Sequence, residues 1–168
     1  FKTQFHTHAT VGNFNNEIGL PLTLLNLSCA HEWAIIEMGM NHPGEISRLS
    51  KIALPDIAMV INTAGVHLEG LGTVENVAKA KAEIFDGIRE NGTAILFSDD
   101  PRRGILESKA KDNKNIKKII FFGSGRDAEV QSVNVETQMA STQFSVRFDD
   151  QENVFSINSP ALFMVDNC

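Results

Sequence analysis

Residues 31–46 read His31-Glu32-Trp33-Ala34-Ile35-Ile36-Glu37-Met38-Gly39-Met40-Asn41-His42-Pro43-Gly44-Glu45-Ile46. The continuous apolar run Trp33–Ile36, bounded by glycine and proline, predicts a strand buried on both faces, as in parallel sheets. Glu37 lies at the carboxyl end of that strand. Ligands of open α/β sheets bind beyond the carboxyl ends of the strands, so we expect Glu37 to hold a magnesium ion, directly or through water. The alternative is a strand-end glutamate that faces solvent.

Helical and strand patterns alternate on both sides of this run. The predicted helices span residues 16–27 and 44–53, a segment that carries Lys81, and a segment after Pro101; the predicted strands span 33–38, 57–61, 93–97 and 118–122. This alternation predicts an α/β fold with a mostly parallel sheet flanked by helices. Three later segments alternate at period two and predict an antiparallel meander, at 130–135, 143–148 and 153–157.

Lys81 stands on the apolar side of a predicted helix. The apolar positions that follow Thr73 form one helical stripe, and Lys81 falls on it; they are Val74, Val77, Ala78, Ile84, Phe85 and Ile88. An ammonium on a core-facing stripe is costly to desolvate unless it is paired, modified or placed at a cavity. Lys81 is therefore a candidate functional residue. The alternative is that its methylenes are buried and its charge returns to water.

Two polar segments carry further candidates. Residues 10–25 place Gly12 and three asparagines before an apolar run, which suits a loop that approaches a ligand with its backbone. An asparagine-rich turn that caps the following helix is the alternative. Asp99-Asp100-Pro101 follows a predicted strand and is interpreted as the cap of the next helix, with a further site element as the alternative.

Composition limits the class of protein. The 168 residues are 42% hydrophobic and 21% charged, which is ordinary usage for a globular domain with a core. The net charge of −6 gives no basic face for nucleic acid. No apolar run approaches the ~20 residues that span a bilayer. Two cysteines without a signal-peptide pattern fit a reducing compartment, so we expect a cytoplasmic protein.

These segments together resemble the Mur ligases, most closely the MurF type, which joins D-alanyl-D-alanine to UDP-N-acetylmuramoyl-tripeptide. The residues that carry the resemblance are Gly12–Gly19 with Pro21–Leu25, Glu37–Gly39 with His42–Ile46, His67–Gly72, and Ala78–Phe85 leading to Asn91-Gly92. They cover the first half of the chain in order. The resemblance implies that the chain is part of a central, P-loop NTPase-like domain, with a parallel α/β part at 1–125 and antiparallel strands and the start of the next helix at 126–168.

The resemblance also implies two magnesium ions and ATP. In such ligases the glutamate that matches Glu37 binds one ion shared with the ATP phosphates, and the histidine that matches His67 helps to bind the second. The lysine that matches Lys81 is commonly carbamylated, which turns an amine into a carboxylate-like ligand. A carbamate forms on the neutral amine, and a desolvated lysine is neutral more often. Lys81 and His67 are thus the expected catalytic residues.

Three asparagines are expected at the nucleotide. Asn13 matches an asparagine that contacts the adenine, and Asn16 belongs to the same loop. Asn167 fits the second asparagine of a family helix that also reaches the adenine. That helix pattern is otherwise matched poorly here, because Phe163 and Met164 replace its first two polar positions.

The implied reaction activates the terminal carboxylate of the UDP-linked tripeptide as an acyl phosphate, which the amine of D-alanyl-D-alanine attacks. The chain has no G-x-x-x-x-G-K-[ST] phosphate loop, and neither a UDP-binding nor a dipeptide-binding domain. We therefore expect an inactive piece of the ligase, which an unpaired sheet edge would allow to self-associate. The alternatives are a non-catalytic binding module on the ligase sheet and another superfamily member, such as a different Mur ligase or a folylpolyglutamate synthase.

Overall fold

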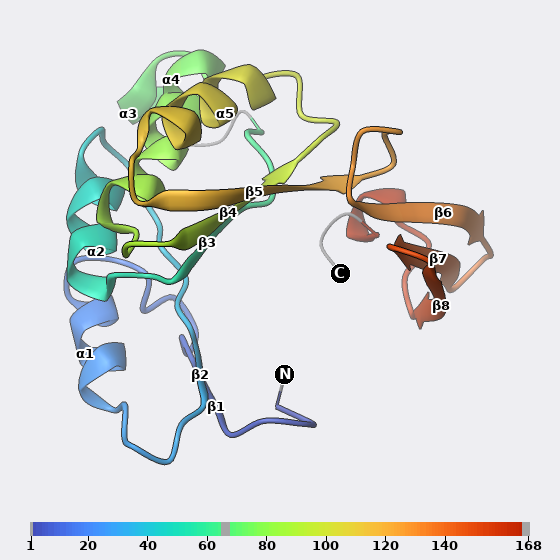
Figure 1. Cartoon of the computed structure of the whole chain (residues 1–168), viewed down its shortest axis with the longest axis horizontal. Helices are drawn as coiled ribbons and strands as arrows, with labels where there is room; N and C mark the ends of the chain where they lie inside the picture. The colour runs from blue at the N-terminus through green and yellow to red at the C-terminus, as the bar shows by residue number, and fades with distance from the viewer. Residues whose placement is uncertain (1, 65–67, 166–168) are drawn as a thin grey trace.

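Two sheets form in residues 2–64 and 68–165, the part of the chain that the computed structural model describes (Figure 1). The larger sheet has six strands in the order β3-β4-β5-β6-β7-β8. Its strands are β3 (Ile57–Val60), β4 (Gly92–Phe97), β5 (Ile116–Gly123), β6 (Val130–Thr137), β7 (Thr142–Phe148) and β8 (Gln151–Ile157). Pairing is parallel from β3 to β6 and antiparallel from β6 to β8. The predicted α/β fold with a terminal meander is therefore confirmed.

The parallel pair β5–β6 lacks a helical crossover. Only Phe122 with Val130 and Gly123 with Gln131 are paired between these strands. Parallel neighbours of full length need a connection of about a dozen residues or more. Here β6 begins beside the end of β5 and continues beyond it (Figure 1). This short overlap joins the meander to the parallel part. Strands β3 and β8 are the outer strands of the sheet, and self-association through one of them stays a prediction.

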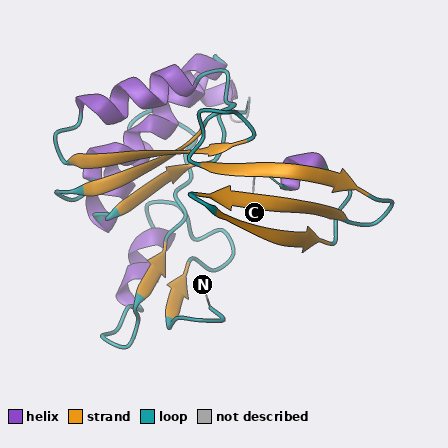
Figure 2. Cartoon of the chain, turned by 45° about the vertical axis from the view of Figure 1, so that its right-hand side comes forward, coloured by secondary structure: helices purple, strands orange, loops and turns teal. Residues whose placement is uncertain are grey.

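Helices cover one face of the parallel strands (Figure 2). The helical segments are α1 (Gly19–Leu25), α2 (Glu45–Ala53), α3 (Leu68–Leu71), α4 (Val74–Ala82), η1 (Glu83–Gly87), α5 (Arg103–Asp112) and η2 (Leu162–Met164). The main core joins β3 and β4 to α5 and η1, with Phe85, Leu96 and Leu106 fully buried. No helix in the described residues is long and apolar enough to cross a membrane.

The predicted burial of the Trp33–Ile36 strand is wrong. Strand β2 (Trp33–Ile35) pairs with β1 (Thr7–Ala9) in a two-stranded parallel sheet that is not hydrogen-bonded to the larger one. Trp33 and Ile35 keep 38% and 45% of their surface exposed. An apolar run shows that a strand can be buried, but burial also needs elements packed against both faces. Strand β1 was also not predicted, because three residues are too few to show a period-two pattern.

The stripe that carries Lys81 is interrupted. The α-helix ends at Ala82 and continues as the 3₁₀ segment η1 to Gly87, so Ile88 lies beyond both. The apolar positions still face inward, because a 3₁₀ turn places side chains three residues apart on one side. A second difference is α3, a four-residue helix that begins at Leu68 and is not among the predicted elements.

Segment η1 is locked onto α2. The Glu83 carboxylate accepts the N–H groups of Gly44 (2.8 and 2.9 Å) and Ser47 (3.2 Å) at the start of α2. Carboxylates are favourable there, because the first N–H groups of a helix lack partners within it. The Ser50 hydroxyl donates to the Ile84 carbonyl and accepts the Gly87 N–H at 3.1 Å. These contacts fix the end of α4, and with it the base of the Lys81 side chain.

Gly87→Ala is expected to destabilise the fold by about 3 kcal/mol, as overpacking against a backbone does. A Cβ at Gly87 would lie 2.1 Å from the Ser50 carbonyl oxygen. Gly104→Ala in α5 is the matched control, because nothing lies within 4 Å of its added Cβ. It should stabilise by about 0.5 kcal/mol through helix propensity. Urea unfolding followed by circular dichroism measures both, and equal responses would show that α2 and η1 are not in close backbone contact.

Candidate functional site

A cavity of about 560 Å³ lies where β2 and β3 end and α4 approaches them. Its lining includes both Glu37 and Lys81, which are 44 residues apart in the sequence. Glu37 follows the end of β2 by two residues, and Asn62 follows the end of β3 by two. The structure therefore confirms the predicted position of Glu37 at the carboxyl end of a strand. It also brings Glu37 and Lys81 to one cavity, as a shared site requires.

The Glu37 carboxylate is oriented by the asparagine loop. Asn15 donates its side-chain N–H to Glu37 Oε1 at 2.8 Å, and the Thr10 hydroxyl accepts the Glu37 backbone N–H at 2.9 Å. The Gly39 N–H donates to the Asn15 carbonyl at 2.7 Å. A Cβ at Gly39 would come within 3.0 Å of the Asn15 amide, so glycine permits this close approach. Sequence reasoning did not identify Thr10 or this role of Asn15.

The Lys81 ammonium is bound to the loop that follows β3. Its Nζ donates to the Asn62 carbonyl oxygen at 2.6 Å and lies 3.4 Å from Asn62 Oδ1. Burial lowers the pKa of Lys81 below its ordinary value, and the negative charge of Asp100 partly opposes this. Lys81 therefore lines the cavity with its ammonium bonded to a protein oxygen atom, and its functional role stays a prediction.

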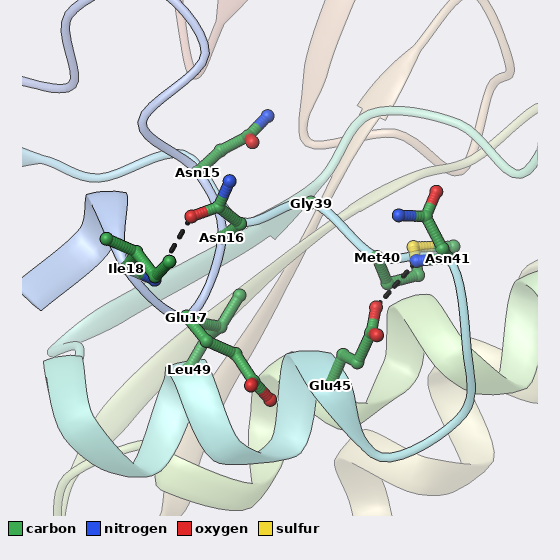
Figure 3. Close-up of a pocket in the computed structure, with 9 residues that line it drawn as sticks. All are labelled: Asn15, Asn16, Glu17, Ile18, Gly39, Met40, Asn41, Glu45 and Leu49. Atoms are coloured by element: carbon green, nitrogen blue, oxygen red, sulfur yellow. Dashed lines mark hydrogen bonds between the residues drawn. The ribbon is translucent and has the colours of Figure 1, made fainter.

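A second cavity, of about 360 Å³, lies between the asparagine loop, the segment at residues 39–41 and α2 (Figure 3). Asn15, Asn16 and Gly39 line it. Asn16 Oδ1 accepts the N–H groups of Ile18 (3.1 Å) and Gly19 (2.9 Å) at the start of α1. Capping, which was the alternative for this loop, is therefore the observed role of the Asn16 oxygen. Met40 lines both cavities.

The loop between these cavities and α2 is held by Glu45. The Asn41 N–H donates to Glu45 Oε2 at 2.6 Å (Figure 3), and the His42 N–H donates to the same oxygen at 3.2 Å. The pKa of the Glu45 carboxyl is lowered, most strongly by the hydrogen bond from the Asn41 N–H and less by the hydrogen bonds and charge of His42. The His42–Ile46 motif therefore has a structural role in closing this loop onto α2.

One predicted site residue lies outside both cavities, and two others are not among the residues that the structure describes. Asn13 is exposed on the turn that begins at Gly12, whose φ is +58°, and it lines neither cavity. His67 and Asn167 lie outside the described residues. The predicted roles of all three stay predictions.

The glycine turn that follows β5 is occupied by a carboxylate of the chain itself. Asp99 accepts the N–H groups of Ser124 (2.7 Å) and Gly125 (3.0 Å) and the Ser124 hydroxyl (2.6 Å). Backbone N–H groups in such a turn can bind phosphate, but Asp99 fills this position. Partial burial raises the pKa of Asp99, and the bonds from Ser124, Ser98 and Gly125 outweigh it and hold the pKa below its usual range. This turn is thus held to the end of β4 by Asp99.

The oxygen atoms at the larger cavity suit a hard cation. Magnesium prefers carboxylate, carbonyl and water oxygens, and the Glu37 carboxylate and the Asn62 oxygens are of this kind. Within residues 2–64 and 68–165 no three histidine, cysteine or acidic side chains gather as a metal centre. A complete site would need further oxygen or nitrogen ligands, and carbamylation would give Lys81 two oxygens.

Comparison with known proteins shows the family of the chain. The Mur ligase middle domain matches residues 1–168. The UDP-N-acetylmuramoyl-tripeptide--D-alanyl-D-alanine ligase of Escherichia coli K12 is 50% identical over 142 residues, which are 84% of this chain and 31% of that protein. The chain thus spans about a third of the curated relatives it matches.

Solved structures agree with the sequence match. A crystal structure of MurF from Acinetobacter baumannii superposes with a TM-score of 0.90 at 30% identity, covering 99% of this chain and 35% of that one. The MurF ligase of Thermotoga maritima in complex with ADP gives 0.81 at 29% identity, covering 99% and 38%. The fold described above is thus shared along nearly the whole chain.

Asp99→Asn should lower the free energy of unfolding by about 1 kcal/mol at pH 7. This magnitude is that of hydrogen bonds to a charged group, reduced because Asp99 is partly exposed to solvent. Because the folded-state pKa of Asp99 is lowered, its contribution is full above its unfolded pKa of about 3.9 and is lost as pH falls through the folded value. The difference between wild type and variant should therefore shrink below about pH 4. Urea titrations at several pH values measure this. Asp150→Asn removes the same charge from an exposed turn as a control, and a gap that widens in acid would contradict the assignment.

Proposed function

This chain belongs to the Mur ligase middle domain family, and we propose that it is the central, ATP-binding part of a ligase that joins D-alanyl-D-alanine to UDP-N-acetylmuramoyl-tripeptide. One observation carries the proposal: Glu37 and Lys81 line one cavity at the carboxyl ends of β2 and β3. The 50% identity to the E. coli ligase of that name supports the choice of substrates. Two substrate-binding parts, for the UDP-linked tripeptide and for the dipeptide, would belong to the rest of the ligase.

Within the chain we assign the chemistry to the parallel part, at residues 1–125. The meander and the following segment, at 126–168, connect that part to the rest of the ligase. This division agrees with the positions of Glu37 and Lys81, which both precede β4. It also agrees with the short overlap of β5 and β6, which are paired at only two positions.

We assign the cation-holding roles to Glu37, His67 and Lys81. Glu37 offers a carboxylate that Asn15 already orients, while His67 is assigned through the family resemblance. Bound magnesium would neutralise phosphate charge and let two anions approach each other. Lys81 fits carbamylation because burial favours its neutral amine, the form that reacts with carbon dioxide.

ATP is the proposed nucleotide, and the ADP complex of the T. maritima relative supports it. Asn13, Asn16 and Asn167 stay our candidates for contacts with the nucleotide. Of these, Asn16 uses its side-chain oxygen to cap α1, so its amide nitrogen is the group that would serve a ligand. The terminal carboxylate of the tripeptide would be activated as an acyl phosphate and then attacked by the amine of the dipeptide.

A non-catalytic module on the same sheet is the competing function. It would keep the helices and strands but would have no need for a carboxylate and a desolvated lysine at one cavity. A different acyl acceptor is the other alternative, and the names of the relatives at 37–50% identity argue against it. An assay of the complete ligase for ADP release that requires both the tripeptide and the dipeptide separates these functions.

Glu37→Gln should lower kcat of the complete ligase at least about 100-fold, because an oxygen ligand of a catalytic cation loses its charge. The matched control is Glu32→Gln, which removes a carboxylate just before the other end of the same strand, where Glu32 accepts the His6 N–H. The control should keep the wild-type rate within about twofold. ADP release at varied magnesium concentration measures both. Full activity of Glu37→Gln at ordinary magnesium would refute the assigned site.

Asn15→Ala should raise the magnesium concentration for half-maximal rate about tenfold, the effect typical of a residue that orients a metal ligand. The Asn15 amide would no longer direct Glu37 Oε1. Asn26→Ala is the control, because Asn26 donates to the Leu22 carbonyl at the end of α1, away from the cavity. If the magnesium dependence of Asn15→Ala were unchanged, the Asn15 amide would not be needed to orient the Glu37 carboxylate.

A further inference from the structure

Asp100 is a buried carboxylate that the proposed chemistry leaves unused. Only 6% of its surface is exposed. Burying a charged group is costly unless hydrogen bonds compensate, and Asp100 accepts three. Thr63 supplies two of them, from its N–H to Oδ2 at 2.6 Å and from its hydroxyl to Oδ1 at 2.7 Å. The third comes from the Arg102 N–H at 2.8 Å.

Only one of these bonds is local. The Arg102 N–H belongs to the N-cap residue of α5, two residues after Asp100. The two bonds to Thr63 connect instead to another element, 37 residues earlier in the chain. Thr63 itself is 2% exposed, so the bonds between Thr63 and Asp100 are shielded from water. Hydrogen bonds are stronger in such a buried setting than in water.

The residue before Thr63 holds Lys81. The Asn62 carbonyl oxygen accepts the Lys81 Nζ at 2.6 Å. The peptide unit that joins Asn62 to Thr63 contains that carbonyl oxygen and the N–H that Asp100 accepts, and a peptide unit is planar and rigid. Fixing the N–H therefore fixes the carbonyl oxygen, and with it the point where the Lys81 ammonium is held.

We propose that Asp100 is a positioning residue of the ligase site: it fixes the Asn62–Thr63 peptide and thereby the place of the Lys81 side chain at the cavity. The inference rests on the proposed function, since it assigns Asp100 a part in the work of Lys81. Asp100 acts mainly through the peptide, and its negative charge also acts on Lys81 by opposing the lowering of the Lys81 pKa. The same bonds set the start of the segment that leads to His67, four residues after Thr63.

The first test is Asp100→Asn in the complete ligase, with Asp99→Asn as the matched control. Asparagine at 100 keeps the shape but turns one acceptor into a donor, which then faces a donor of Thr63. We expect kcat to fall about 10- to 100-fold with KM for ATP and for the dipeptide little changed, as for a misplaced catalytic group. Asp99→Asn removes the same charge one residue earlier, from bonds that go to Ser124 and Gly125, and it should keep kcat within about threefold.

A pair of variants at Thr63 keeps the test decisive if Asp100→Asn does not fold. Thr63→Ser keeps both donors and should retain kcat within about threefold, whereas Thr63→Val keeps the shape without the hydroxyl and should lose about tenfold. Thermal unfolding of each variant shows whether a loss of rate merely follows a loss of stability. Equal rates for Thr63→Ser and Thr63→Val, or for Asp100→Asn and Asp99→Asn, would overturn the inference.

Lys81→Ala separates this inference from the function on which it rests. If Lys81→Ala retains the wild-type rate, the proposed role of Lys81 fails and the inference fails with it. If Lys81→Ala abolishes the reaction while Asp100→Asn behaves as Asp99→Asn does, the proposed function stands and the positioning role alone is wrong. Loss of rate in both Lys81→Ala and Asp100→Asn, with Asp99→Asn active, supports both.

Discussion

Parallel pairing of β3 and β4 is the constraint on which the site depends. Parallel strands end at the same edge of a sheet, so the loops that follow them must meet there. The register pairs Val60 with Leu96, and Thr63 and Asp100 each follow the end of their strand by three residues. Their contact thus follows from the register. Lys81 reaches the same edge because Ala82, at the end of α4, packs in the core with these strands, and η1, which follows it, is bonded to α2.

The strands of the larger sheet could be predicted from local patterns, because each needs only its own apolar positions. The predicted bounds of β3 and β4 differ from the observed ones by one residue at one end, and the meander was found from its period of two. The burial of β2 could not be predicted in this way. The apolar run Trp33–Ile36 indicates only that these side chains could be buried. Their observed exposure arises because few elements pack against β2.

The candidate site shows the same division between local and distant information. Glu37 and Lys81 were found because a carboxylate at a strand end and a lysine on an apolar stripe are anomalies within a few residues of sequence. Asn15 and Asp100 were missed or interpreted as caps, since their partners lie 22 and 37 residues away. Asparagine and aspartate are common in turns and caps, so their local setting gives no sign of a distant partner.

The two charged groups that define the larger cavity are held in different ways, and this difference has a consequence for the chemistry. Lys81 is partly buried and bound to a peptide that the buried Asp100 fixes, so its position is set before any ligand arrives. Glu37 is exposed, and a single side-chain amide orients it. A cation that binds between them would therefore find one rigid side and one adaptable side. Rigid groups lower the cost of organising the reacting atoms, whereas an exposed carboxylate can change its contacts as phosphate charge moves during the reaction. The more rigid of the two groups is thus the lysine, whose ammonium is bonded to the Asn62 carbonyl oxygen.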